Sequence, residues 1–506
     1  MTKDSYMQFF ETLQDKGPVA HLFEVDGKGM LYDTGTNKVV KCDKWEYEIL
    51  KAILSTDSVK SVIQRLFIEE DELEIEQALQ KIYNAIQQED ILNVELERKF
   101  NLTDHYSSMK DPTQTRLKQL VFEVTESCNL RCRYCTYDDE YTTHRNHGKN
   151  SMPLEIAYKA LDYLASHNSE EDEVDISFYG GEPLLRFDFI KDCVAYAQKN
   201  VHVKKINFNM TTNLTLMTTE IAEYLSINDF TVVASIDGPE DIHNMYRLDS
   251  SGKGSYVKAI EGFRKLLKAY GDNVSRRIII NMVYAPPYSR KKLDTMQKFI
   301  EEEGFEDIVI QTSYPIPNSI PADYRTDEMD LSMFEWSADK LLCSFYEGSE
   351  KRPFNHDSIN AFLQNIRHTY PSKEANFLLP LNHCCIPTHS RMYVTCNGDI
   401  RICERIMGSL SIGNMFDGID FETLKEIYDE YQKKSIETCS KCWASKMCTQ
   451  CFATTYTDRN FDMEKRNKFC LITKETLSKA LKLYYKVYLH NPEKLLYIDT
   501  LNLQMI

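Results

Sequence analysis

The sequence predicts an α/β fold, in which a parallel sheet curves into a partial barrel between two smaller domains. Two observations indicate this. From residue 117 to 330, apolar strand-like stretches alternate with amphipathic helical stretches, which is typical of β/α units. On either side of this region the pattern changes, to short strands followed by helices before it and to a dense run of cysteines after it.

The strands of the barrel are expected at six places, between most of which lie helical stretches such as 154–167 and 256–270. These places are 119–124, 174–179, 205–212, 231–236, 277–285 and 307–313. Six consecutive units of this kind predict a parallel (β/α)6 partial barrel. In that architecture the functional groups lie at the carboxyl ends of the strands.

Residues 1–103 predict a winged-helix-like module. Short strands at 21–25, 30–33 and 38–42 are joined by the turn sequences DGKG and TGTN, and helical patterns follow at 44–55, 57–67 and 72–88. The polar segment 101–115 predicts a linker, so the barrel is expected to survive removal of the module. Beyond the barrel we expect a helical connector at 331–380, a cysteine-rich domain at 381–475 and a tail at 476–506.

Charge and hydropathy exclude several classes of protein. The formal net charge is −17, whereas proteins that hold nucleic acid usually present a basic face. The longest apolar runs are too short to cross a bilayer, and the first residues lack the layout of a secretion signal. We therefore predict a cytoplasmic protein with neither a nucleic-acid nor a membrane partner.

The cysteines are concentrated in two groups. Of 15 cysteines, only Cys42, Cys193 and Cys343 lie outside these groups. Because a reducing cytoplasm disfavours disulfides, clustered cysteines indicate metal or redox chemistry there.

The first group, Cys128, Cys132 and Cys135, forms a CxxxCxxC motif directly after the first expected barrel strand. Three thiolates can hold three corners of a [4Fe–4S] cluster and leave one iron open. An open coordination position distinguishes a catalytic metal site from a structural one. A zinc site is the alternative, with His144 or His147 as a fourth ligand.

This motif at this place resembles the radical S-adenosylmethionine (SAM) superfamily. The resemblance implies that SAM chelates the open iron and that one electron cleaves it to a 5′-deoxyadenosyl radical, which abstracts a substrate hydrogen. It also implies an external one-electron reductant such as flavodoxin or ferredoxin. By the same resemblance, Tyr134 lies against the adenine.

Three further strand ends resemble SAM-contacting motifs of the superfamily. The first is Gly180–Gly181–Glu182, whose glycines let the backbone approach a ligand closely and whose resemblance implies contact with the SAM amino group. The second ends in Asn213, followed by Leu214 where the family usually has glycine. The third, SIDGP, is followed by His243 and Arg247, with Asn244 in place of the usual aspartate. The resemblance implies that Ser235 faces the ribose and Arg247 a SAM carboxylate, with Asp237 also in the cofactor site.

The second group of cysteines resembles the SPASM domain, an extension of radical SAM enzymes that modify peptides. This resemblance implies two auxiliary [4Fe–4S] clusters, hence three in all. The outer one is bound by Cys439, Cys442, Cys448 and Cys470, and the inner one by Cys385, Cys403 and Cys451, with Cys396 or Cys384 as its fourth ligand or with an open iron. Only two residues separate Cys448 from Cys451, where the family has three. Judged from the residues alone, two zinc ribbons are an alternative, because thiolates also bind zinc.

The segment 29–53 resembles the PqqD-like modules that recognise leader peptides. Together the resemblances imply a maturase of a ribosomally made precursor peptide, with the leader added as a strand to residues 30–42. A thioether between a cysteine sulfur and a peptide carbon is the expected product. The alternatives are a carbon–carbon cross-linking maturase, a sulfatase-type formylglycine maturase and a non-catalytic, metal-stapled peptide-binding scaffold.

Overall fold

The computed structural model confirms the predicted α/β fold class. It describes residues 1–101, 116–135, 137, 147–170, 172–315, 332–347, 353–380, 385, 387–406, 410–451, 455–456 and 460–500. No helix within these ranges combines the length and the apolar character needed to cross a membrane.

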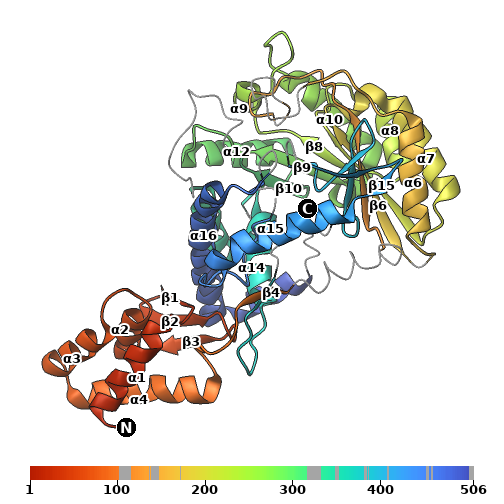
Figure 1. Cartoon of the computed structure of the whole chain (residues 1–506). Helices are drawn as coiled ribbons and strands as arrows, with labels where there is room; N and C mark the ends of the chain where they lie inside the picture. Colours follow the sequence, from red (N-terminus) through yellow and green to blue (C-terminus); the bar gives the residue numbers. More distant parts are fainter. Residues whose placement is uncertain are drawn as a thin grey trace.

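Six parallel strands form the barrel sheet, adjacent in chain order, and all six coincide with expected strands. They are β5 (Gln119–Thr125), β6 (Glu173–Gly180), β7 (Lys205–Thr212), β8 (Thr231–Ser235), β9 (Ile278–Val283) and β10 (Val309–Ser313). The helices between them lie on the outer side of the sheet (Figure 1): α6 (Leu154–Ser166), α7 (Phe187–Asn200), α8 (Thr219–Ile227), α10 (Tyr256–Tyr270) and α12 (Arg290–Glu303). Apolar side chains such as Ile176, Phe208 and Leu161 fill the space between the layers.

The sheet continues into the cysteine-rich region. β12 (Met392–Val394) pairs parallel with β5, and β13 (Asp399–Arg401), β14 (Ser411–Asn414) and β15 (Gly418–Ile419) follow as antiparallel strands, which makes ten strands in all. Gly398, with φ +87°, lies in the turn between β12 and β13. The sequence pattern predicts little regular structure here, because strands of two to four residues carry no readable periodicity.

Long helices complete the C-terminal half. α15 (Phe421–Cys439) buries Leu424, Ile427 and Tyr428, and α16 (Met463–His490) runs across the expected boundary at 475. α16 packs with α13 (Ser332–Glu347) and α14 (His356–Arg367) in the region expected to be a helical connector.

The N-terminal module contains the expected strands and helices. β1 (Ala20–Val25), β2 (Lys28–Asp33) and β3 (Val39–Cys42) form an antiparallel sheet in that order. α2 (Lys44–Ile53), α3 (Val59–Glu69) and α4 (Glu72–Glu89) follow, and a capping box of Asp43 and Glu46 begins α2. A further helix, α1 (Lys3–Asp15), precedes them, and its Phe10 packs into the module's core.

The module is docked on the C-terminal half rather than tethered to it. Phe23, Val25, Met30 and Tyr32 of its sheet share an apolar core with side chains of α16. β4 (Lys99–Asn101) pairs with β11 (Leu378–Pro380), so the chain is held directly before the expected linker, most of which lies outside the described residues. Figure 1 shows α16 between the module and the barrel. Removing residues 1–103 therefore exposes an apolar face on the C-terminal half, a cost that the polar segment 101–115 does not indicate.

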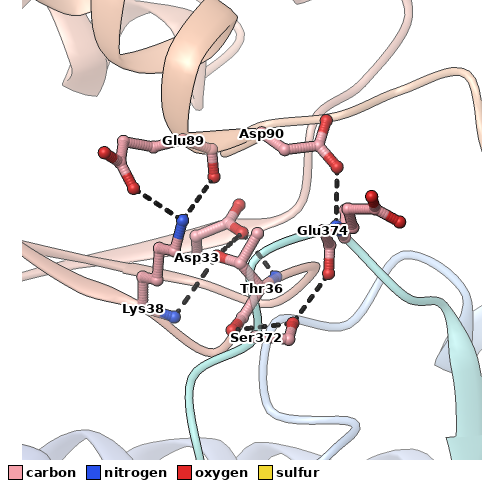
Figure 2. A network of polar contacts seen from close by, with 8 residues as sticks. Asp33, Thr36, Lys38, Glu89, Asp90, Ser372 and Glu374 are labelled. Carbon is pink, nitrogen blue, oxygen red and sulfur yellow. Dashed lines mark hydrogen bonds and ion pairs between the residues drawn. The ribbon is translucent and has the colours of Figure 1, made fainter.

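A polar network fixes the turn between β2 and β3 to the segment near residue 374 (Figure 2). The buried carboxylate of Asp33 accepts hydrogen bonds from the backbone N–H and hydroxyl of Thr36, both at 2.7 Å. The Thr36 carbonyl accepts one from the Ser372 N–H at 2.8 Å, and the Asp90 carboxylate one from the Ala375 N–H at 2.6 Å. Lys38 joins the end of α4 through an ion pair with Glu89 at 2.7 Å. The turn thus links the module to the connector as well as to α4.

Candidate active site

The cysteine loop begins where β5 ends, and the Gly180–Gly181 segment after β6 packs directly against it. The Gly181 N–H donates to the Thr125 carbonyl at 2.7 Å, and the Glu182 N–H to the Ser127 carbonyl at 2.9 Å. Gly180 has φ +125°, and a Cβ at Gly181 would lie 2.1 Å from the Ser127 oxygen. The glycines thus allow close approach of one backbone to another, beside Cys128, rather than only the approach to a ligand expected from the sequence.

Glu182 joins the ends of β6 and β7. Its buried carboxylate accepts hydrogen bonds from the Asn213 N–H at 2.8 Å, the Thr212 hydroxyl at 2.7 Å and the Leu184 N–H at 3.1 Å. Burial raises the pKa of this carboxyl, and the three donors oppose that effect. Glu182, expected at the SAM amino group, in this structure braces two strand ends.

Asn213 extends from the end of β7 to the cysteine loop. Its side-chain amide donates to the side-chain oxygen of Asn129 at 2.9 Å and lies 3.8 Å from the Cys128 sulfur. The next residue, Leu214, has φ +68°, a conformation that favours glycine and accounts for the family's preference there. The third strand end therefore lies beside Cys128.

Asp237, after β8, is the centre of a buried polar cluster. Arg247 binds it twice, through Nε to Oδ2 at 3.0 Å and through a terminal nitrogen to Oδ1 at 3.1 Å. The Val283 N–H donates to Oδ1 at 3.0 Å, and the Tyr134 hydroxyl donates a short hydrogen bond to Oδ2. Asp237 therefore connects the cysteine loop to the ends of β8 and β9, and both its oxygens are satisfied.

This cluster gives Tyr134 and Arg247 partners within the protein. The Tyr134 ring lies 5.5 Å from the guanidinium of Arg247, so the residues expected at the adenine and at a SAM carboxylate both contact Asp237. Arg247 is also an electrostatic neighbour of the Cys132 thiol. Ser235, expected at the ribose, lies buried at the last position of β8.

His243 supports the Asp237 cluster from behind. Its Nδ1 accepts from the Asp237 N–H at 3.4 Å, and its Nε2 lies 3.1 Å from the Ser255 hydroxyl, which donates to the Arg247 carbonyl at 2.8 Å. Burial lowers the pKa of His243 to about 4. A neutral imidazole therefore fixes the backbone around both Asp237 and Arg247.

The thiols of the loop are neighbours of one another. Burial raises the pKa of Cys128 and that of Cys132 to about 12. The neighbouring Cys132 raises the pKa of Cys128 further, and the neighbouring Cys135 raises the pKa of Cys132 further. His147 lies 3.8 Å from the Cys135 sulfur, whereas His144 is outside the described residues. Among the described residues, no group of three or more His, Cys, Asp or Glu side chains is arranged so that it could hold a metal ion. Three adjacent thiols on one loop nevertheless form the donor set that an iron–sulfur cluster takes.

Four cysteines of the second group come together from α15, α16 and the loop between them. Cys442 and Cys470 are electrostatic neighbours of Cys439, and all three are neighbours of Cys448. Burial raises the pKa of Cys439 to about 11 and that of Cys448 to about 12. The four residues predicted for the outer cluster thus lie in one neighbourhood, although among the described residues they are not arranged closely enough to hold a metal ion.

The predicted inner cysteines are more dispersed. Arg391 has both Cys385 and Cys403 as electrostatic neighbours and forms an ion pair with Glu404 at 2.6 Å. Cys396 instead lies against β5, where its thiol donates to the Glu123 carbonyl at 3.1 Å and its N–H to the Glu123 carboxylate at 3.1 Å. Cys451 packs against the barrel-side core, and Cys384 is outside the described residues.

Arg466 lies beside the cysteines of the outer group but belongs to none of the sequence motifs. Arg466 donates to the Cys439 sulfur at 3.1 Å. Its sequence signal is the spacing from Cys470, since residues four apart on a helix share a face.

Comparison with known proteins agrees with this arrangement. Residues 122–300 match the family model described as the radical SAM superfamily. A serine-type anaerobic sulfatase-maturating enzyme of Bacteroides thetaiotaomicron is 33% identical over 351 residues, which cover 67% of this chain and 81% of that protein. The chain belongs to the radical SAM superfamily. A cysteine-type anaerobic sulfatase-maturating enzyme of Clostridium perfringens is 24% identical over 347 residues, 66% of this chain and 87% of that one.

A solved structure shares the fold of this radical SAM protein. It is titled "Native anSMEcpe with bound AdoMet", has a TM-score of 0.54 at 20% identity, and covers 76% of this chain and 100% of that chain. Members of the superfamily bind SAM and a [4Fe–4S] cluster, and the cysteine loop after β5 lies within the matched residues.

Proposed function

We propose that this radical SAM enzyme matures a ribosomally made precursor peptide by forming a thioether between a cysteine sulfur and a peptide carbon. The observation that carries the radical part is the convergence of strand ends on the cysteine loop. Asn213 from β7 reaches Cys128, and Arg247, held by Asp237 after β8, lies beside Cys132.

Cys128, Cys132 and Cys135 would hold the catalytic [4Fe–4S] cluster, which with SAM supplies the 5′-deoxyadenosyl radical. The surrounding residues keep this loop in place: Glu182 joins β6 to β7, and Asp237 fixes Tyr134. Arg247 binds Asp237 through Nε and one terminal nitrogen. The other edge of its guanidinium can orient a bound carboxylate while the pair with Asp237 stays intact.

The second group of cysteines would hold two auxiliary clusters, so that the loaded chain carries about twelve irons. The four grouped cysteines at 439, 442, 448 and 470 can ligate one cluster fully. Cys385 and Cys403 beside Arg391 are two ligands of the other, with Cys451 as a third. The contacts of Cys396 with Glu123 favour an inner cluster that keeps one iron for a substrate thiolate.

A peptide substrate is supported by two observations. The relatives at 33% and 24% identity are named as enzymes that maturate sulfatases, which are themselves proteins. In addition, β3 is an edge strand of the N-terminal sheet, while β1 at the opposite edge contacts α16. A leader peptide can therefore add as a strand along β3, within the expected 30–42 region.

The proposed thioether reaction is balanced in atoms and electrons. A hydrogen atom leaves the peptide carbon to 5′-deoxyadenosine, the thiol loses its proton, and the new C–S bond releases one electron to an auxiliary cluster. The peptide thus loses two hydrogens. An external reductant of the flavodoxin or ferredoxin type would supply the electron that starts each turnover.

Formylglycine formation is the second candidate, and the named activity of the relatives favours it. The two products differ chemically, because formylglycine is an aldehyde, whereas a thioether consumes a thiol without making a carbonyl. Incubating the anaerobically reconstituted enzyme with SAM, a reductant and cysteine-containing precursor peptides tests both. We expect a product lighter by two hydrogens that resists thiol alkylation and does not react with a hydrazide. A hydrazide-reactive product identifies formylglycine instead, and SAM cleavage without any peptide product contradicts both.

A further inference from the structure

Arg466 is a buried cation that has no acidic partner in the part of the chain that the structure describes. It is 1% exposed, and its terminal nitrogens donate to the Ser435 hydroxyl and to the Cys439 sulfur. The guanidinium lies 4.9 Å from the Tyr431 ring, and its Nε, also buried, has no hydrogen-bond partner among the described residues. Besides Tyr431, its electrostatic neighbours are the thiols of Cys439, Cys470 and Cys448.

The position of Arg466 makes an uncompensated charge more costly. It lies in the first turns of α16, where the helix dipole is unfavourable for a cation. A buried charge is strongly destabilising unless a counter-charge offsets the loss of hydration. Among the described residues Arg466 contacts a hydroxyl, a cysteine sulfur and an aromatic ring but no carboxylate, whereas thiolates bound to a metal centre would place negative charge beside it.

We propose that Arg466 is the counter-cation of the outer metal–thiolate centre at Cys439, Cys442, Cys448 and Cys470, and that it raises the reduction potential of that cluster. This inference rests on the proposed assignment of the four cysteines. A thiolate-ligated [4Fe–4S] cluster is anionic, and reduction adds one more negative charge. A fixed positive charge that donates a hydrogen bond to a ligand sulfur therefore stabilises the reduced form more than the oxidised one.

Arg391 provides a matched comparison at the other cysteines. It too is a mostly buried arginine with thiols as neighbours, but Glu404 is already its ion-pair partner at 2.6 Å, and Gln119 accepts from its Nε at 2.8 Å. Neutralising Arg391 removes the arginine that pairs with Glu404 at 2.6 Å, whether or not metal is bound. Neutralising Arg466 removes a charge that has no carboxylate partner among the described residues and that the metal centre would compensate.

The test is the effect of Arg466→Met on the iron-free and on the reconstituted full-length chain, measured by anaerobic thermal unfolding. Methionine has a similar reach without charge, so R466M should raise the melting temperature of the iron-free chain and lower that of the reconstituted one. Arg391→Met should lower both. A purely structural role for Arg466 predicts that R466M also lowers both, and that result overturns the inference.

A redox titration of the reconstituted chain, followed by electron paramagnetic resonance, gives an independent readout. We expect one auxiliary signal to move to a more negative potential in R466M, and to stay near the wild-type value in Arg466→Lys, which keeps the charge. An unchanged potential in R466M at full iron content overturns the proposed tuning while leaving the cluster assignment intact. If instead the wild-type chain carries zinc and no iron at these cysteines, the assignment itself fails.

Discussion

Two sites in the molecule each contain a buried arginine beside cysteine sulfurs, but their surroundings differ. One is the barrel mouth, the cluster of Asp237 and Arg247 beside Cys132 at the strand ends. The other is the outer cysteine group with Arg466. Arg247 is bound twice by Asp237, whose remaining lone pairs accept from Tyr134 and Val283. Arg466 has a hydroxyl, a sulfur and an aromatic ring around it, and no carboxylate among the described residues.

This difference shows two ways of building a metal site. At the barrel mouth the parallel sheet brings the strand ends together, and charges are balanced within the protein before any cofactor binds. In the outer group, two helices and a loop carry the proposed ligands, and by our proposal the charge balance is left to the bound metal. The first site should therefore keep its shape without a cofactor, whereas the second should depend on it.

The most severe test removes the barrel ligands. Replacing Cys128, Cys132 and Cys135 together by Ala should reduce 5′-deoxyadenosine formation to background, because these three thiols are the proposed ligands of the catalytic cluster. Iron should fall from about twelve to about eight per chain, since the auxiliary sites assemble independently. Chromatography of the nucleoside and iron analysis measure these effects. Continued SAM cleavage by the triple variant would refute the site assignment.

The internal charge balance of the barrel mouth can be broken by Asp237→Asn. This change leaves Arg247 buried without its carboxylate, and we expect a loss of about 3–5 kcal/mol in the free energy of unfolding, measured by urea denaturation. Glu302→Gln, which removes the exposed ion pair with Lys298, is the control and should cost less than about 0.5 kcal/mol. Equal, small effects of the two variants would show that the Asp237 cluster is not the support we describe.

His243 makes the stability of the barrel mouth sensitive to pH. The folded chain holds His243 neutral down to a pKa of about 4, whereas the unfolded chain binds a proton near pH 6.5. The contribution of His243 to the free energy of unfolding is therefore fully present above about pH 6.5. It falls by up to about 3 kcal/mol as the pH is lowered towards 4. Unfolding curves of wild type and His243→Gln between pH 7 and 4 measure this. The stability difference between them should shrink across that window, and a constant difference contradicts it.

The smallest expected effect concerns the N-terminal module. The His21 ring stacks on Trp443, next to Cys442, at a centroid distance of 3.9 Å, and its Nε2 lies 2.8 Å from the Ser478 hydroxyl. His21→Ala should cost about 1 kcal/mol and make the junction between the module and the outer group more sensitive to limited proteolysis. The exposed His202 offers the control, since its replacement by Ala should change neither property.

The sequence predicts the six barrel strands and the three helices of the N-terminal module because these are long and strongly periodic. It also predicts which residues converge, since the carboxyl ends of parallel strands meet at one edge. The sequence does not predict which of these side chains bind each other. A motif that contains Asp237 and Arg247 does not indicate that the two form an ion pair, because both could instead face a ligand. β12 to β15 are too short to leave a pattern, and the docking of the module depends on side chains hundreds of residues apart, such as His21 and Ser478.

The pairing of β12 with β5 has a consequence for how such enzymes diversify. β5 leads into Cys128 at its carboxyl end, and β12, running alongside in the same direction, leads into Thr395 and Cys396. Backbone hydrogen bonds therefore fix the spacing between the two cysteine-bearing ends, independently of the chain that joins β10 to β12. The spacing of these two strand ends therefore tolerates changes in the intervening stretch, provided that α13 and α14 keep their packing on α16 and β11 its pairing with β4.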